Sequence, residues 1–210
     1  MNIYTLLGAA ALTLTVACDD DPAAGKHKSA ASAPVTAPAK AAEGTSVKFD
    51  ISEVNSAVEF VGAKISMKHD GQFSKFSGQL DLVDGDPSKS RLSVEIQMAS
   101  VNIQPGKLGM HLKSPDFFDV AKFPTANFVT TSLTKLDGTN EYKVTGNLTL
   151  HGVEKSIDFP AKITVGAGSI AVSAEFAINR KDFGIVYAGM ADDLIKDDVL
   201  LKLSLNPKNS

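Results

Sequence analysis

Apolar and polar side chains alternate at every second position through most of this chain, and that alternation constrains its fold more than any other feature. Apolar side chains recur in this way in about eight segments, at residues 58–62, 76–82, 92–98, 126–136, 142–150, 157–165, 170–178 and 199–205. Successive side chains of a strand point to opposite faces of a sheet, so each segment predicts a strand with one apolar face. Such strands suit an antiparallel sheet with one dry side and one wet side, and the chain is therefore predicted to be all-β.

Short turn sequences separate these segments. Residues 84–87 (DGDP), Asp137 with Gly138, His151 with Gly152, and residues 166–168 (GAG) each lie between two predicted strands. Gly and Asp are typical of the tight reversals that join antiparallel strands. Several predicted strands are longer than the usual five or six residues, which favours a single curled barrel of about eight strands over a compact sandwich.

Three glycines, Gly62, Gly78 and Gly146, fall on apolar faces of the predicted strands. A missing side chain at such a position lets a strand bend sharply or leaves room inside the barrel. A core filled by its own side chains and an internal cavity are both consistent with these positions.

The alternation is interrupted by an aromatic segment, predicted to be a short helical plug around residues 108–121. Ser114 followed by Pro115 predicts a helix start, because Ser caps free amide groups and Pro fits the first helical position. Phe117 and Phe118 are adjacent and cannot share one helix face, so the segment has to pack against an apolar surface.

The chain begins with an uncharged apolar run, residues 3–17, that ends in small residues before Cys18. This run is shorter than the roughly 20 residues that span a bilayer, so residues 1–17 are predicted to be a signal peptide. The sequence TVAC at residues 15–18 resembles a bacterial lipobox. Cys18 is therefore predicted to be acylated and to anchor a lipoprotein that faces the periplasm. Soluble periplasmic secretion and a retained membrane anchor are the alternatives, and the choice of membrane stays open.

Residues 18–44 are rich in Ala, Pro, Lys and Ser and contain few large apolar side chains. Such a composition cannot bury enough surface to offset ordering entropy, so this stretch is predicted to be a disordered tether. The remaining residues, 45–210, are enough for one domain with a substantial core.

Several function classes find no support in the sequence. Cys18 is the only cysteine, which excludes a disulfide framework and a CxxC site. The net charge is −3 with no basic stripe, so no nucleic-acid partner is expected. There is no G-x-S-x-G, phosphate-binding glycine loop or H-E-x-x-H motif, and the acidic residues between 192 and 198 lack the order of a calcium loop. The chain is therefore not expected to be an enzyme.

The histidines do not predict a metal site. His69, His111 and His151 lie far apart in the sequence. His111 with Asp116 and Asp119 has a spacing that matches no common zinc site, which favours a structural role for this segment.

Three segments together resemble a known family. They are HLKSPDFFDVAKFPTANF at residues 111–128, YKVTGNLTLHGVEKSIDF at 142–159 and INRKDFGI at 178–185. In this order they resemble the YceI-like family of lipid- or polyisoprenoid-binding proteins, over roughly residues 47–205. The resemblance implies a lipocalin-like antiparallel barrel whose interior holds a long apolar chain.

On that reading, inward-facing apolar side chains line the ligand site. The candidates are Phe60, Phe76, Leu80, Ile96, Met98, Phe117, Phe118, Phe128, Leu148, Phe159, Phe176 and Phe183. Asn179, Arg180 and Asp182 are candidates for holding a headgroup, since Arg suits a phosphate or carbonyl oxygen. A turn stabilised by an Arg–Asp pair is the alternative.

The expected function is non-enzymatic binding, storage or transport of an isoprenoid, such as a quinone or polyprenyl chain, in the bacterial cell envelope. No cofactor is expected apart from such a bound lipid or quinone. The alternatives are a filled barrel that acts as a scaffold or interaction protein, and a metal-dependent periplasmic enzyme. Ligand identity and oligomeric state stay open, and a homodimer is one of the states considered.

Overall fold

The fold is described from a computed structural model, which covers residues 21–35 and 43–209. The predicted signal peptide, residues 1–17, and the predicted acylation site Cys18 lie outside the described residues.

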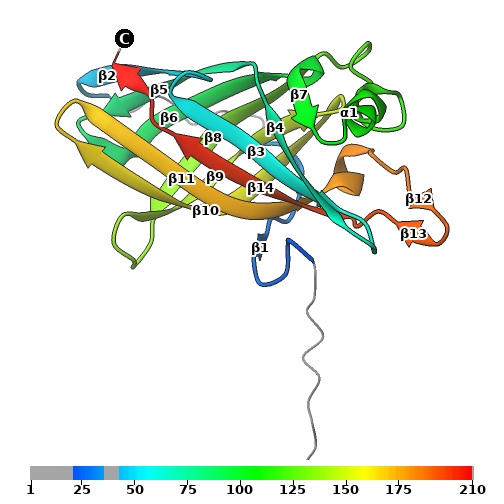
Figure 1. Cartoon of the computed structure of the whole chain (residues 1–210). Coiled ribbons are helices and arrows are strands. Elements are labelled where there is room, and N and C mark those ends of the chain that lie inside the picture. Colours follow the sequence, from blue (N-terminus) through cyan, green and yellow to red (C-terminus); the bar gives the residue numbers. More distant parts are fainter. Residues whose placement is uncertain (1–20, 36–42, 210) are drawn as a thin grey trace, which may run out of the picture.

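Ten strands of six or more residues make up most of the structure (Figure 1). They are β2 (Ser46–Ser52), β3 (Ser56–Ala63), β4 (Lys68–Phe73), β5 (Phe76–Val83), β6 (Asp86–Gln97), β8 (Thr125–Lys135), β9 (Glu141–Leu150), β10 (Val153–Gly166), β11 (Ser169–Asn179) and β14 (Asp198–Leu205). The shorter elements are β1 (His27–Lys28), η1 (Met98–Ser100), β7 (Val101–Ile103), α1 (Gly106–Lys113), η2 (Arg180–Phe183), β12 (Gly189–Met190), β13 (Asp193–Leu194) and β15 (Lys208–Asn209).

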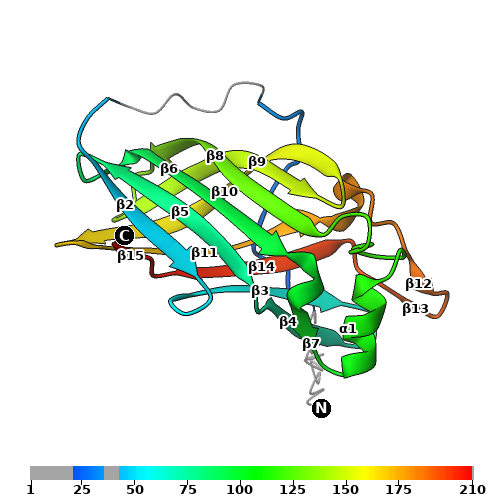
Figure 2. The same ribbon diagram turned by 90° about the horizontal axis from the view of Figure 1, so that it is seen from above.

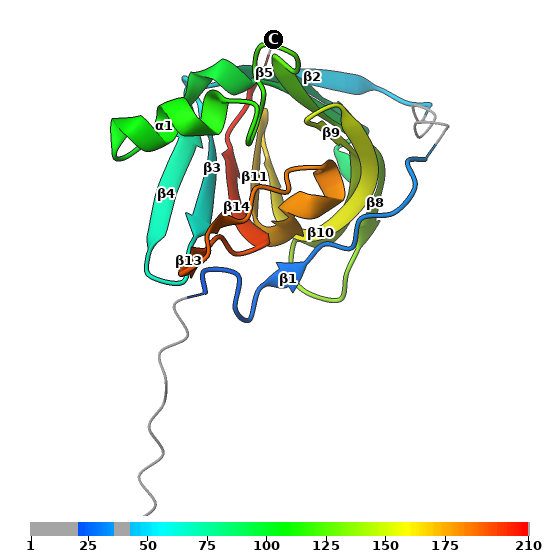
Figure 3. The ribbon, with the colours of Figure 1, turned by 90° about the vertical axis from the view of Figure 1, so that its right-hand side faces the viewer.

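One curled sheet holds nearly all of these strands, in the order β15-β2-β5-β6-β8-β9-β10-β11-β14-β3-β4-β7. Every neighbouring pair along this path is antiparallel. Figure 3 looks along the curled sheet and shows that it wraps around an interior, and Figure 2 shows the same sheet from above. Within the described residues no ladder joins β2 to β3 or β7, so a seam interrupts the ring there. The prediction of a curled antiparallel barrel, roughly lipocalin-like, with a short helix is confirmed.

All eight predicted strands are present. The turn predicted at residues 84–87 is limited to Asp84 and Gly85, because Asp86 and Pro87 begin β6. The β9–β10 hairpin turns at His151 and Gly152, whose φ angles are 51° and 74°. A Cβ atom on Gly152 would lie 2.3 Å from the ring of Phe123, so both the backbone angle and the close approach require glycine here. Two further long strands, β2 and β4, were not predicted.

The helix begins and ends earlier than predicted. It spans Gly106–Lys113, and Ser114, the predicted start, is its C-terminal cap. Both the hydroxyl and the amide of Ser114 donate to the carbonyl of His111, at 2.8 and 3.0 Å. Pro115 has no amide hydrogen with which to continue the helix. The segment that follows, with Phe117 and Phe118, is a series of turns rather than a helix.

The prediction of a disordered tether over residues 18–44 is wrong for residues 21–35, named here the N-terminal strap. β1 pairs in parallel with β11, at the positions of Phe176 and Ala177. Further along the strap, Ser32 exchanges backbone hydrogen bonds with Ser156 of β10. The β10–β11 ladder ends at Ala161, and the strap bridges the two strands beyond that point. Backbone groups in this gap need partners, and the strap provides them.

No helix in the described part of the chain has the length and apolar character needed to cross a membrane.

Candidate functional site

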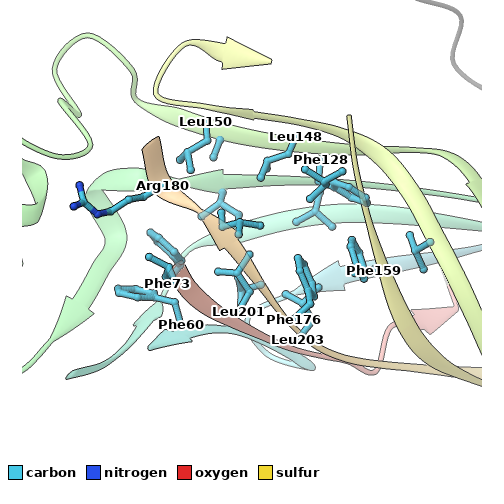
Figure 4. Close-up of a pocket in the computed structure, with 18 of the residues that line it drawn as sticks. Phe60, Phe73, Phe128, Leu148, Leu150, Phe159, Phe176, Arg180, Leu201 and Leu203 are labelled. Atoms are coloured by element: carbon cyan, nitrogen blue, oxygen red, sulfur yellow. The ribbon is translucent and has the colours of Figure 1, made fainter. Parts of the chain in front are cut away.

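The interior of the barrel contains an apolar cavity, part of which is drawn in Figure 4. The inward side chains of β3, β5, β6, β8, β9, β10, β11 and β14 line it, and almost all of them are apolar. The volume of this cavity is about 250 Å³. The alternation of the sequence therefore builds a hollow interior, in contrast to the alternative of a barrel packed solid by its own side chains.

Aromatic rings shape the middle of the cavity. Phe159 of β10 and Phe176 of β11 stack in parallel, with ring centroids 3.9 Å apart and planes 2° from parallel. Phe128 of β8 lies 5.6 Å from Phe159 between ring centroids (Figure 4). Flat rings of this kind offer broad apolar surfaces against which a hydrocarbon chain can lie.

One end of the barrel, named here the α1 end, is covered by α1, the turns after it and η2. A second group of buried apolar side chains gathers there, including Phe60, Leu112, Phe117 and Ile185. Phe73 lies 5.5 Å from Phe60 and 6.1 Å from Phe118 between ring centroids, which joins β3, β4 and the turn after α1. The plug thus covers part of this end of the cavity with packed rings.

Basic side chains border the cavity at the α1 end. Lys64, His69, Arg180 and Lys196 all line it there. At the opposite end, where β6 begins, the polar lining consists of Ser90, Arg91 and Thr130. The hydroxyl of Thr130 bonds the backbone of Leu92, and that of Ser90 bonds the carbonyl of Asp86. Basic side chains are thus more numerous at the α1 end, and Lys64, Arg180 and Lys196 are each paired there with a carboxylate.

Arg180 is the buried cation of this site, with 4% of its surface exposed. Its guanidinium donates to the carbonyl oxygens of Ile185 (2.7 Å), Lys196 (3.1 Å) and Ile195 (3.3 Å). It also pairs with the carboxylate of Asp197 at 3.1 Å. Burial lowers the pKa of Arg180, and the charge of Asp197 partly offsets that effect. Most of its donors therefore hold the segment between η2 and β14 in place.

The three predicted headgroup residues are not brought together. Arg180 borders the cavity, whereas Asn179 and Asp182 do not. The Asn179 side chain accepts from the amide of Lys181 and caps η2, and Asp182 is exposed. An Arg–Asp pair is present, but the partner is Asp197, which immediately precedes β14.

The predicted lining residues are nearly all at the cavity wall. Those that border it are Phe60, Leu80, Ile96, Met98, Phe117, Phe118, Phe128, Leu148, Phe159 and Phe176. Phe76 and Phe183 do not border it, although both belong to the main core cluster. Phe183 sits in η2 with none of its surface exposed, so its ring fills the wall behind the lining.

Several lining residues were not predicted. Leu150, Leu201 and Leu203 border the cavity, and their positions in alternating segments could have identified them. Phe73 lies in β4, whose sequence KHDGQF has no apolar alternation to reveal it.

The histidines have separate structural contacts. His111 Nε2 lies 2.9 Å from the Asp116 carboxylate, and its ring packs against Phe117 and Tyr187. The Nδ1 atoms of His69 and His151 each lie 3.2 Å from a backbone carbonyl, of Gln104 and Phe183 respectively. Among residues 21–35 and 43–209, no group of three or more His, Cys, Asp or Glu side chains is arranged to hold a metal ion.

Comparison with known proteins identifies relatives of this chain. Residues 32–206 match the family model described as the YceI-like domain. A UPF0312 protein of Pseudomonas putida is 34% identical over 135 residues, which cover 61% of this chain and 70% of that protein.

Two solved structures are similar in fold. Burkholderia cenocepacia BcnA has a TM-score of 0.66 at 23% identity, covering 74% of this chain and 98% of BcnA. A polyisoprenoid binding domain from Saccharophagus degradans has a TM-score of 0.63 at 16% identity, covering 79% of this chain and 100% of that domain. At these identities the likeness establishes the fold.

Proposed function

The chain belongs to the YceI-like family, and from this premise we propose that its barrel binds a long-chain isoprenoid or another amphiphilic lipid without transforming it. The observation that carries the proposal is the apolar cavity along the barrel axis, with basic groups gathered at the α1 end. A similar fold in Saccharophagus degradans is described as a polyisoprenoid binding domain, which supports the same class of ligand here.

The physical basis of binding is burial of hydrocarbon. Each methylene group moved from water into an apolar site contributes about 0.8 kcal/mol. Such a site needs few directed polar contacts, because the hydrophobic effect is not directional. The contributions do not simply add, since a flexible chain loses conformational freedom when it enters the cavity. Chain length and shape therefore determine selectivity, and a polar headgroup is held near Lys64, Arg180 and Lys196.

A binding role accounts for the site better than a catalytic one. The lining is apolar over nearly its whole length, and Arg180, its buried cation, is bonded to three backbone carbonyls and to Asp197. General acid–base chemistry requires a titratable group within reach of the reacting atom. Most of the cavity wall has no such group. The four basic groups are gathered at one end of this apolar lining, where the polar headgroup of a lipid would lie.

We further propose that the protein acts in the bacterial cell envelope, attached through an acylated Cys18. The lipobox-like sequence at residues 15–18 supports this. A lipid anchor would keep the barrel beside the membrane that contains its ligand, and storage or transfer of that ligand would then need no diffusion through the periplasm.

Extraction of the native ligand tests the proposal. Protein purified from its own host is extracted with organic solvent, and the extract is analysed by mass spectrometry. An isoprenoid or other long-chain lipid is expected in stoichiometric amount. Recovery of no apolar ligand, together with no calorimetric signal on titration with an isoprenoid quinone, would overturn it.

A matched pair of variants links binding to the cavity. Gly62 lines the cavity, and no atom lies within 4 Å of a Cβ placed there, so the side chain of Gly62→Leu should extend into the cavity and occupy ligand space. Glu59→Leu adds a similar side chain to an exposed position of the same strand. Gly62→Leu should abolish quinone binding and Glu59→Leu should leave it unchanged, with both variants folded.

A further inference from the structure

Six large apolar side chains are exposed at the α1 end of the barrel. Ile65 and Met67 lie in the β3–β4 turn, Met110 on α1, Val186 after η2, and Met190 and Leu194 on the β12–β13 hairpin. Between 45% and 69% of the surface of each is exposed. We name these six residues the apolar rim. Exposed apolar groups gathered on one part of a surface mark a place of contact with a protein or a membrane.

Hydrogen bonds hold two parts of the rim side by side. The amide of Ile65 donates to the carbonyl of Leu194 at 3.1 Å. The Lys64 ammonium and the Ser66 amide both bond the carboxylate of Asp193. The β12–β13 hairpin is thereby fixed against the β3–β4 turn, and the exposed side chains of both belong to one surface.

A ring contact connects the other two segments of the rim. Tyr187, the neighbour of Val186, lies 5.1 Å from the His111 ring of α1 and 5.3 Å from Phe117. The loop that contains Val186 therefore packs beside the helix that contains Met110. The rim is thus built on packed elements at the α1 end of the barrel.

The N-terminal strap starts at this same surface (Figure 3). The carboxylate of Asp21, the first described residue, lies 3.4 Å from the ammonium of Lys196, two positions after Leu194. Cys18 precedes Asp21 by three residues, and three residues of chain reach at most about 11 Å. An acyl anchor on Cys18 would thus hold the membrane close to the apolar rim.

The cavity reaches the same end of the barrel. Lys64 and Ile195, which line it, are the immediate neighbours of Ile65 and Leu194. Lys64 pairs with Asp193, and Lys196 pairs with Asp21. Because these cations are matched by carboxylates, apolar insertion rather than net charge would hold this surface to lipid.

We propose that the apolar rim inserts into the interface of a lipid bilayer, so that the α1 end of the cavity faces the membrane from which the ligand is taken. This inference rests on the proposed lipid-binding function. It assigns a loading surface, which lipid binding alone does not require.

Site-specific probes on the membrane-bound full-length protein test the proposal. Met190→Cys and Ile65→Cys are each labelled with the fluorophore NBD and mixed with vesicles of phosphatidylethanolamine and phosphatidylglycerol. Val54→Cys is the control, because Val54 is 84% exposed in the β2–β3 turn outside the rim. Labelling of the unsubstituted protein measures any contribution from Cys18 itself.

The vesicles also contain phosphatidylcholine with a doxyl quencher on its acyl chain. Quenching of the probes at residues 65 and 190, with a roughly tenfold weaker effect at residue 54, is the expected result, since only side chains that enter the interface by about 5–10 Å meet the quencher. Equal quenching at all three positions, or none at any of them, would overturn the inference. Failure to bind the vesicles at all would overturn it as well.

Ligand binding is measured on the same labelled proteins. Titration with an isoprenoid quinone in the absence of vesicles reports on the cavity alone. Normal quinone binding with unquenched rim probes would reject the docking surface and leave the lipid-binding function standing. Absence of quinone binding by the unlabelled protein would instead reject the proposed lipid-binding function. Quenching of the rim probes by vesicles that contain a bound partner protein, but not by lipid alone, would also reject a direct bilayer contact.

Discussion

Ser29 of the N-terminal strap and Asp158 of β10 exchange two hydrogen bonds. The Ser29 hydroxyl donates to the carbonyl of Asp158 at 2.7 Å and accepts from its amide at 3.0 Å. The Ser29 amide meanwhile donates to the carbonyl of Ala177 in β11 at 2.8 Å. Ser29 thus joins β10 and β11 where these two strands do not pair with each other. The strap is therefore a structural part of the barrel wall.

Ser29→Ala should destabilise the fold by about 1–3 kcal/mol. The substitution leaves the amide and carbonyl of Asp158 without this partner, at a site where Ser29 is only 6% exposed. Urea-induced unfolding followed by circular dichroism measures the change. Ser88→Ala, at an exposed position in β6, is the control and should change stability by less than about 0.5 kcal/mol. Equal stability of the two variants would mean that the strap contributes little to the fold.

Arg180→Lys should cost about 2–4 kcal/mol although it keeps the positive charge. The guanidinium reaches the carbonyl oxygens of Ile185, Ile195 and Lys196 and the carboxylate of Asp197 at once, which a single ammonium cannot do. Chemical denaturation gives the loss.

Lys181→Met provides the control for Arg180. Lys181 also pairs with Asp197, but its side chain is 49% exposed, so removing that pair should cost no more than about 1 kcal/mol. If Arg180→Lys is as stable as Lys181→Met, the bonds of Arg180 to the backbone do not determine the position of this segment.

The alternation of apolar residues was sufficient to predict the fold class and eight strands. The alternation arises because one face of each strand is buried, so it identifies a strand only where one face is shielded from water. β2 also has it, in Val47, Phe49 and Ile51, and could have been predicted by the same criterion. β4 could not have been predicted in this way, because its sequence KHDGQF has no alternation of apolar residues. Gly71, near its centre, leaves space for the ring of Phe60.

Local signals were less reliable at the ends of elements and in the N-terminal segment. A serine such as Ser114 can cap either end of a helix. Only its hydrogen bond to the carbonyl of His111 shows that it caps the C-terminal end of α1. Val35 is the single large apolar side chain of the strap, so its composition resembles that of a disordered segment. Its order comes from partners such as Ser156 and Asp158, more than 120 residues later in the chain. The partner of Arg180 was likewise unpredictable, because Asp197 and Asp182 are equally plausible in the sequence.

Acid should release the β12–β13 hairpin from the β3–β4 turn. The hydrogen bond from Lys64 holds the pKa of the Asp193 carboxyl below its ordinary value; burial opposes this, and bonds from Ser66 and the charge of Lys64 add to it. A carboxyl whose pKa is lower in the folded state contributes stability above its unfolded pKa of about 3.9 and loses it as the pH falls through the folded value.

Hydrogen exchange of the Ile65 and Ser66 amides measures this release. Their protection factors should be constant from about pH 7 to pH 5 and should fall below about pH 4. Asp193→Asn removes the titration, so protection in that variant should be low throughout and independent of pH. Unchanged protection of the native protein at about pH 3 would contradict the prediction.

Two glycines on neighbouring strands should respond differently to the same added methyl group. A Cβ on Gly71 would lie 2.3 Å from Cζ of Phe60, whereas a Cβ on Gly62 would have no atom within 4 Å. Gly71→Ala must therefore push the Phe60 ring, which lines the cavity, at a cost of about 1–3 kcal/mol.

Quinone binding distinguishes the two glycine variants further, because the displaced Phe60 ring changes the cavity wall beside Phe73. Gly71→Ala should bind an isoprenoid quinone more weakly than the native protein in calorimetric titration. Gly62→Ala has free space for its methyl group and should keep native affinity, with stability unchanged or higher by up to about 1 kcal/mol, since alanine restricts the unfolded chain. Equal quinone affinity and equal stability of the two variants would contradict this prediction. The Phe60 ring would then be able to move without changing the binding site.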